Sequence, residues 1–147
     1  CTPPQVLRYR AKISGPLLDR FDLHVEVPVQ SGEVLMKRDG GGESSTVVRD
    51  RVYQARERQM HRGSGNAALS GGELQTLCRV GAARHAILPA AMERLGLSAR
   101  ALHRILRVAR TLADLDGLDH IGNGHLVEAL GYRKLDRQQT RNAQVSV

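Results

Sequence analysis

The stretch from Ala99 to Leu115 constrains the fold more than any other part of the sequence, because its apolar residues recur at the spacing of an α-helix. These residues would form one buried face, and they are Leu102, Ile105, Leu106, Ala109, Leu112 and Ala113. Ser98 can cap the start of this helix by accepting a backbone N–H. A helix with a broad apolar face must cover it with other elements. The sequence therefore predicts a helical bundle.

The opposite stripe of the same helix carries Arg100, Arg104 and Arg107. Like charges at this spacing repel each other by roughly 0.2–0.5 kcal/mol per pair, so the stripe favours an anionic or acidic partner. Arg100 also lies in the first turn, where the helix dipole is already positive. Two interpretations of Arg100 follow from the residues: an exposed arginine paired with a nearby glutamate, or an arginine that meets a phosphate group.

Further helices are expected from capping residues and apolar spacing, over residues 46–61, 71–80, 82–95 and 124–132. Ser70 and Glu73 match a capping box at the start of the second of these. Pro89 either breaks the third or lies in the first turn of a helix that begins near Leu88. Aromatic residues make up 3% of the chain and tryptophan is absent. The core must therefore be aliphatic, which favours helix packing over a β-sandwich.

Residues 13–27 combine a turn with a strand-like alternation. A Gly-Pro pair marks the turn, and one helical turn can follow it. Leu23, Val25 and Val27 then alternate with polar residues at a period of two. This pattern predicts a short strand over residues 23–27.

Arg20 lies between that helical turn and the predicted strand, with Asp19 beside it and Asp22 two residues away. One interpretation is a surface arginine paired with one of these acids. The other is a side chain that points out of the domain, available to a partner. The residues alone leave both interpretations open.

The net charge of +7 and the pI of about 10.2 suit a polyanionic partner such as nucleic acid. A compositional preference for arginine that only adds solubility is the other explanation.

No apolar run approaches the roughly 20 residues that span a bilayer, so no membrane partner is expected. The two cysteines give no disulfide framework, which favours a cytoplasmic location. Without an initiator methionine or a signal peptide, the chain is expected to be cut from a longer protein.

No metal site is expected, because the acidic turn over residues 114–119 lacks the spacing of a calcium loop. Cys78 is expected to be a small core residue and not a nucleophile, since no partner motif accompanies it. His125 and Glu128 are both expected to be exposed on the last helix.

The run GPLLDRFDL at residues 15–23 resembles the LLSRFDL-type segment of AAA+ ATPases in the Mg-chelatase and MCM helicase branch. Longer runs look like the Mg-chelatase-like ComM (YifB) family, and they span residues 1–28, 42–59, 97–117 and 125–133. The resemblance implies a mainly α chain, with a helical AAA+ lid preceded by a remnant of the α/β core that includes one short strand. The implied divisions are the end of the core (1–30), a glycine-rich linker (31–45), the lid (46–133) and a flexible tail (134–147).

The same resemblance implies roles for particular arginines. In such ATPases the arginine of the LLSRFDL-type segment is a finger that reaches the ATP of the neighbouring subunit, so Arg20 is the expected finger. The run LSARALHRILR resembles the sensor-2 helix, which makes Arg100 the expected contact to the γ-phosphate and Arg104 a weaker candidate for cofactor binding. The chain contains neither Walker A nor Walker B. ATP and Mg²⁺ are therefore expected only in the full-length protein, and the chain alone is expected to hydrolyse nothing.

A finger that acts across an interface implies a ring of identical subunits, expected to be a hexamer. The family resemblance implies a helicase that migrates DNA branches during natural transformation and recombination. The close alternative is a magnesium-chelatase ATPase subunit, which drives Mg²⁺ insertion into a porphyrin. A small basic helical DNA-binding module without ATP coupling is a third interpretation.

Overall fold

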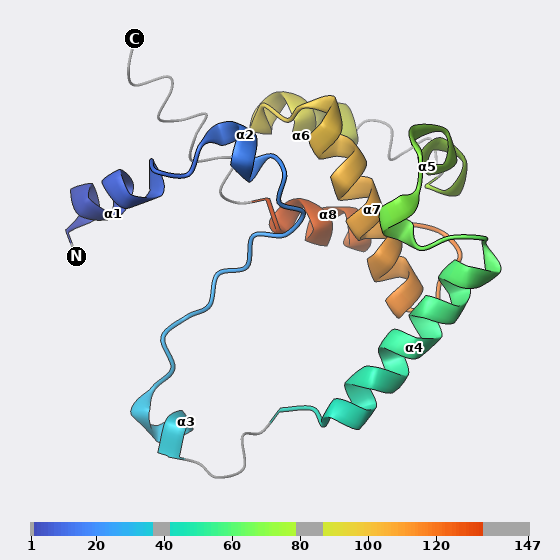
Figure 1. Cartoon of the computed structure of the whole chain (residues 1–147), viewed down its shortest axis with the longest axis horizontal. Coiled ribbons are helices and arrows are strands. Elements are labelled where there is room, and N and C mark those ends of the chain that lie inside the picture. Colours follow the sequence, from blue (N-terminus) through green and yellow to red (C-terminus); the bar gives the residue numbers. More distant parts are fainter. Residues whose placement is uncertain (1, 37–41, 79–86, 134–147) are drawn as a thin grey trace.

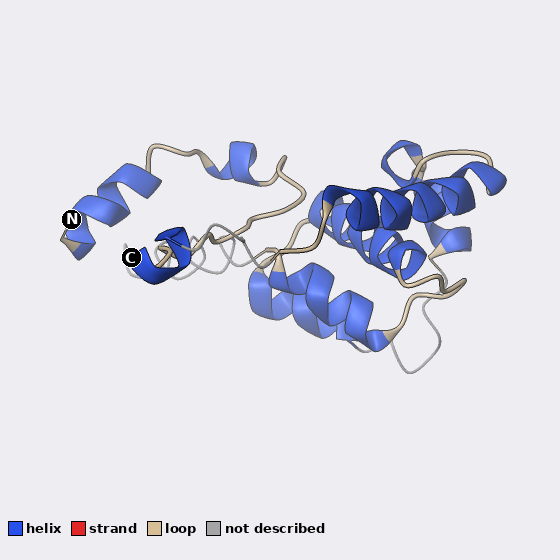
Figure 2. Ribbon diagram, turned by 90° about the horizontal axis from the view of Figure 1, so that it is seen from below, coloured by secondary structure: helices blue, strands red, loops and turns tan. Residues whose placement is uncertain are grey.

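The computed structural model describes residues 2–36, 42–78 and 87–133, and this part of the chain is mainly helical (Figure 2). The α-helices are α1 (Pro3–Arg10), α2 (Gly15–Leu18), α3 (Gly32–Met36), α4 (Ser45–His61), α5 (Gly71–Leu77), α6 (Ile87–Leu95), α7 (Ala99–Leu115) and α8 (Asn123–Gly131), with a 3₁₀ helix η1 at Asn66–Ala68. The mainly α expectation is confirmed for these residues. None of the helices described is long and apolar enough to cross a membrane.

Helix α7 is the centre of the bundle, and α4, α5, α8 and η1 all pack against it (Figure 1). Ile105, Ala109 and Ala113 on its predicted apolar face are at most 1% exposed. They join a core that also contains Leu69, Leu74, Cys78, Ile121, Leu126 and Ala129. The small side chains of α7 let neighbouring backbones approach closely, so one helix can anchor several others.

The predicted helix starts agree with the structure where local capping chemistry fixed them. The Ser98 hydroxyl accepts the Ala101 amide at 3.1 Å at the start of α7. In the predicted capping box of α5, the Ser70 amide donates to the Glu73 carboxylate at 2.8 Å. Helix α6 has Pro89 in its first turn, and the expected start of that helix at residue 82 falls outside the described residues.

The predicted strand over residues 23–27 is wrong. This segment forms no strand, and Leu23, Val25 and Val27 are 49%, 68% and 79% exposed. A strand needs a neighbour to satisfy its backbone groups, and the part of the chain that the structure describes contains no strand that could pair with it. The alternation therefore marked residues with strand character that lack a sheet here. Within residues 2–30 the structure contains α1, α2 and this segment, so the one short strand expected for the α/β remnant is absent there.

A buried ion cluster joins α4, η1 and α7. Asp114 on α7 is 2% exposed, and the Arg62 guanidinium donates to both of its carboxylate oxygens, at 2.7 and 2.5 Å. Arg110, which is 1% exposed, approaches the same carboxylate at 3.0 Å. The side-chain amide of Asn66 on η1 adds a donor at 2.7 Å. Asp114 thus belongs to α7, within the predicted span of that helix, and is buried in the core, which the acidic turn pattern over residues 114–119 did not indicate.

Arg110 also holds the turn that follows α7, by hydrogen bonds from inside the core. Gly117 takes φ +73°, a conformation that favours glycine, and the Leu118 amide then returns to the Ala113 carbonyl at 2.8 Å. Arg110 donates to the carbonyl oxygens of Leu118 and Asp119. The turn that leads from α7 to α8 is therefore closed by a buried cation.

The start of α8 depends on His125. This residue is only 8% exposed, so the expectation that it lies on the surface is wrong. Its Nδ1 accepts the Gly122 amide at 2.8 Å, and its Nε2 lies 2.9 Å from a carboxylate oxygen of Asp116. The ring satisfies one free amide of the helix start, a task that a glycine cap cannot perform by itself. Glu128 is exposed, as expected.

Replacing Asp114 with asparagine is expected to destabilise the chain by about 3–5 kcal/mol, because Arg110 and Arg62 would lose their buried counter-charge. The measurement is the urea unfolding midpoint followed by circular dichroism. Glu43→Gln is the matched control, because it removes an exposed ion pair with Arg51 and should change the midpoint little. Equal midpoints for wild type and Asp114→Asn would contradict the role of this cluster.

Stability is expected to fall in acid through the same carboxylate. Burial by itself raises the pKa of Asp114. Hydrogen bonds from Arg62 and Asn66 and the charges of Arg110 and Arg62 lower it by more than burial raises it, so the net pKa lies below the ordinary 3.8. The unfolded chain then binds the proton more readily. The contribution of Asp114 is present above pH about 4 and is lost as pH falls through its folded pKa. Asp114→Asn should remove this part of the pH dependence in urea titrations repeated at decreasing pH.

Candidate functional site

Arg20 follows α2, and its side chain is exposed. Neither neighbouring acid holds it. Asp19 accepts a hydrogen bond from Ser98 at 3.2 Å, and Asp22 pairs with Arg104 at 2.6 Å. Among the described residues the Arg20 guanidinium has no hydrogen-bond or ion-pair partner. The interpretation of a surface arginine paired with Asp19 or Asp22 is therefore not what the structure contains.

Residues 18–24, which we call the docking segment, lie against α7. Leu18 is 7% exposed and anchors the segment by burial. One nitrogen of Arg104, Nη1, donates to the Arg20 carbonyl at 2.5 Å and to Asp22 at 2.6 Å. The backbone of Arg20 is therefore fixed, while its side chain is left free.

A second arginine, beyond the end of α8, holds the other side of the docking segment. Arg133 is 1% exposed, donates to the Phe21 carbonyl, and lies 3.6 Å from a carboxylate oxygen of Asp19. The adjacent Tyr132 carbonyl accepts the His24 amide at 2.8 Å. Sequence reasoning missed this contact because more than 100 residues separate the partners, and no local pattern signals such a pairing.

Arg100 lies in the first turn of α7 and is exposed, as expected for a residue on the outer stripe. It has no hydrogen-bond or ion-pair partner in the described part of the chain. The hydrogen bond between Ser98 and Asp19 joins the start of α7 to the docking segment. The structure therefore brings Arg20 and Arg100, which are far apart in the sequence, to the same end of the domain.

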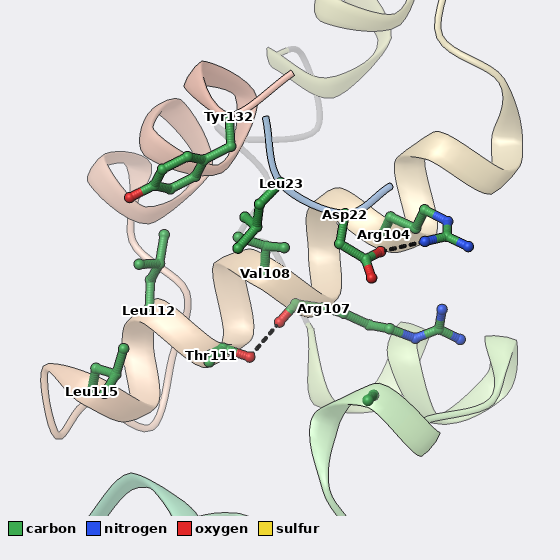
Figure 3. Close-up of a pocket in the computed structure, with 10 residues that line it drawn as sticks. Asp22, Leu23, Arg104, Arg107, Val108, Thr111, Leu112, Leu115 and Tyr132 are labelled. Atoms are coloured by element: carbon green, nitrogen blue, oxygen red, sulfur yellow. Dashed lines mark hydrogen bonds and ion pairs between the residues drawn. The ribbon is translucent and has the colours of Figure 1, made fainter. Parts of the chain in front are cut away.

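Arg104 and Arg107, the other arginines of the outer stripe, are engaged within the chain. Arg107 donates to the Leu69 carbonyl at 2.7 Å, and Arg104 holds the docking segment. Both line a groove of about 510 Å³ along α7 (Figure 3). The remaining lining residues are Asp22, Leu23, Ala67, Val108, Thr111, Leu112, Leu115 and Tyr132. A nucleotide contact by Arg104 stays a prediction.

Cys78 is 4% exposed and belongs to the core, as expected. Burial raises the pKa of its thiol to about 11. The thiol is therefore not ionised near neutral pH, and it has none of the thiolate character that a nucleophile needs.

No group of three or more His, Cys, Asp or Glu side chains suited to a metal ion occurs in the described residues.

The fold and site define a helical domain that carries an arginine-bearing segment docked on its central helix. Family models match both parts: residues 42–133 match "Magnesium chelatase, subunit ChlI C-terminal", and residues 1–35 match "Magnesium chelatase, subunit ChlI". The chain belongs to this magnesium chelatase ChlI-like family.

Curated relatives agree with this assignment. The chain is 46% identical over 137 residues to competence protein ComM of Haemophilus influenzae, and 46% identical over 138 residues to the uncharacterized protein YifB of Escherichia coli. It is 40% identical over 139 residues to the uncharacterized protein Rv2897c of Mycobacterium tuberculosis. These matches cover 92%, 93% and 91% of this chain and 27% of each relative. The predicted ComM/YifB resemblance is confirmed.

Proposed function

We propose that this chain is the C-terminal part of a ComM-like AAA+ ATPase, in which Arg20 acts on the ATP of the neighbouring subunit and Arg100 on the ATP of its own. The observation that carries the proposal is the contrast among the arginines at this end of the domain. Arg104 and Arg133 are engaged within the chain, whereas Arg20 and Arg100 are exposed and unpaired. An unpaired guanidinium suits recognition of a phosphate group.

The chemistry of these two residues would be electrostatic. ATP with Mg²⁺, held mainly by the longer protein, would supply the phosphoryl group that is transferred. Arg20 would place a fixed positive charge where negative charge develops, a contribution worth roughly 10³–10⁵ in rate where it has been measured. Arg100 lies in the first turn of α7, where backbone amides and the helix dipole also favour an anion.

Both residues belong to one subunit but would serve different sites. Such an arrangement requires identical subunits in a closed ring, because each interface must pair the Arg20 of one subunit with the nucleotide site of the next. We take the ring to be a hexamer, as in the family that the sequence resembles.

DNA is the partner that we propose for the ring, in helicase and branch-migration activity during transformation and recombination. The net charge of +7 supports it, and so does the 46% identity to a protein named for competence. Magnesium insertion into a porphyrin is the second candidate, and the name of the matching family model favours it.

Two inactive variants are expected to restore each other if the arginines act on different sites. In the full-length protein, Arg20→Ala and Arg100→Ala should each abolish most ATP turnover. When they are mixed 1:1, an Arg20→Ala subunit offers an intact site, and an Arg100→Ala neighbour offers an intact finger. Random assembly makes about one interface in four fully intact, so turnover should recover to about a quarter of the wild-type rate.

The control is each variant mixed with itself, which should recover nothing. If mixed rings are as inactive as the separate variants, the two arginines serve the same site and the assignment of Arg20 as a trans finger is wrong. Unchanged turnover in Arg20→Ala alone would exclude a finger role altogether.

The DNA proposal predicts that branched DNA raises ATP turnover of the full-length protein, and that this stimulation weakens steeply with added salt because phosphate contacts release counterions. The measurement is steady-state turnover with and without DNA over a salt series. Turnover that ignores DNA but still requires Arg20 would keep the ATPase assignment and favour the chelatase candidate.

A further inference from the structure

We propose that Arg104, together with Arg133, is a positioning residue that fixes the backbone of Arg20, so that the lid of each subunit sets the position of its own finger. The inference rests on the proposed function, because it concerns how the proposed finger is held. It differs from the sequence-based expectation that Arg104 contacts the nucleotide.

The first support is the geometry around Arg20, where two arginines hold the carbonyls of two successive residues. Arg104 donates to the carbonyl of Arg20 itself, at 2.5 Å. Arg133 donates to the carbonyl of the next residue, Phe21. Hydrogen bonds from a cation to a carbonyl are among the stronger ones available to a backbone. The part of Arg20 that is fixed is its main chain, and the guanidinium remains free to reach outward.

The second support is that the acids flanking Arg20 also bind this lid. Asp22 pairs with Arg104 at 2.6 Å, and Asp19 lies 3.6 Å from Arg133. Each clamping arginine therefore holds one carbonyl and one carboxylate of the docking segment. An acid so engaged is not available to neutralise Arg20, and the clamp thereby keeps the finger charge unpaired.

The third support is burial. The side chains of Arg133 and Arg104 are only 1% and 21% exposed. A buried guanidinium requires compensating partners, and the docking segment supplies carbonyl and carboxylate oxygens to both. If the segment left α7, these partners would be lost together. The segment and the lid should therefore move as one body.

The consequence is a link between two nucleotide sites. Arg100 and Arg104 are four residues apart on α7, so they lie on the same side of the helix. A shift of α7 that follows the nucleotide at Arg100 would carry Arg104, and with it the backbone of Arg20. The state of one site would then set the finger that serves the next. A finger displaced by about 1 Å can lose roughly 10²-fold in rate.

Mixed rings of the full-length protein test the assignment directly, because they report which site a residue serves. Arg104→Ala alone should lower ATP turnover about 10-fold or more, with the KM for ATP changed less than about twofold. Mixed 1:1 with Arg100→Ala, it should recover turnover to about a quarter of wild type, because its nucleotide site is intact and its neighbour supplies a held finger. Mixed with Arg20→Ala, it should recover nothing, because neither subunit supplies a positioned finger.

The opposite pattern would overturn the inference. If Arg104 contacts nucleotide, Arg104→Ala will raise the KM for ATP, will be restored by Arg20→Ala subunits and will not be restored by Arg100→Ala subunits. Wild-type turnover in Arg104→Ala, beside an inactive Arg20→Ala, would also overturn it while leaving the proposed function intact. Failure of Arg20→Ala and Arg100→Ala to restore each other would instead mark failure of the proposed function.

Further variants separate positioning from loss of folding. Asp22→Asn removes the acid held by Arg104, and it should follow the same mixing pattern even if Arg104→Ala fails to enter rings. Arg104→Lys retains the charge and should recover part of the lost turnover. Arg51→Ala is the matched control, because Arg51 lies on α4, a helix away from the docking segment (Figure 1), and forms an exposed ion pair with Glu43. It should leave basal turnover unchanged.

Hydrogen exchange supplies a readout of the clamp itself. The His24 amide donates to the Tyr132 carbonyl only while the segment is docked. In Arg104→Ala this amide should exchange at least several-fold faster than in wild type, while amides within α7 keep their protection. Equal exchange of His24 in both proteins would show that Arg104 does not hold the segment.

Discussion

The structure depends on one buried carboxylate, that of Asp114. A lone charge in this position would be very costly, and it is tolerated because Arg110 and Arg62 bind it from two directions. Arg62 follows α4 directly, so the pairing fixes the C-terminal end of that helix against α7. Arg110 also holds the turn that leads to α8. One ion cluster thereby orients the helices on either side of α7.

The arginines of α7 change their role along the helix. Arg110 is inside the core, Arg107 holds the carbonyl before α5, Arg104 holds the docking segment, and Arg100 meets solvent. Each is a strong donor with the same chemistry, so the difference comes from what packs beside it. The hydrogen bonds and ion pairs of Arg104, Arg107 and Arg110 fix α7 against its neighbours. The N-terminal end of α7 can therefore hold the unpaired Arg100 at a rigid position. The domain is thus suited to hold charge where a partner can meet it.

How much of this could be predicted from the sequence depends on the range of the interaction. The span of α7 and its cap at Ser98 were predicted, because helix periodicity and capping involve neighbours in the chain. The strand over residues 23–27 was predicted wrongly, since a strand is stable only with a partner that the pattern cannot supply. The sequence indicates neither the burial of Asp114 nor that of His125, because only tertiary packing brings their partners to them.

The candidate site shows the same limit at the residues that matter most. The motif could single out Arg20, but Asp19 and Asp22 beside it suggested a neutralised surface arginine. In the structure Asp19 contacts Ser98 and Arg133 instead, and Asp22 pairs with Arg104. Arg20 therefore remains unpaired despite its two acidic neighbours, because partners from distant parts of the chain bind both acids. Since these partners come from α7 and from the residues that flank α7 and α8, the availability of the Arg20 charge depends on contacts between distant parts of the chain, and no local pattern could have revealed it.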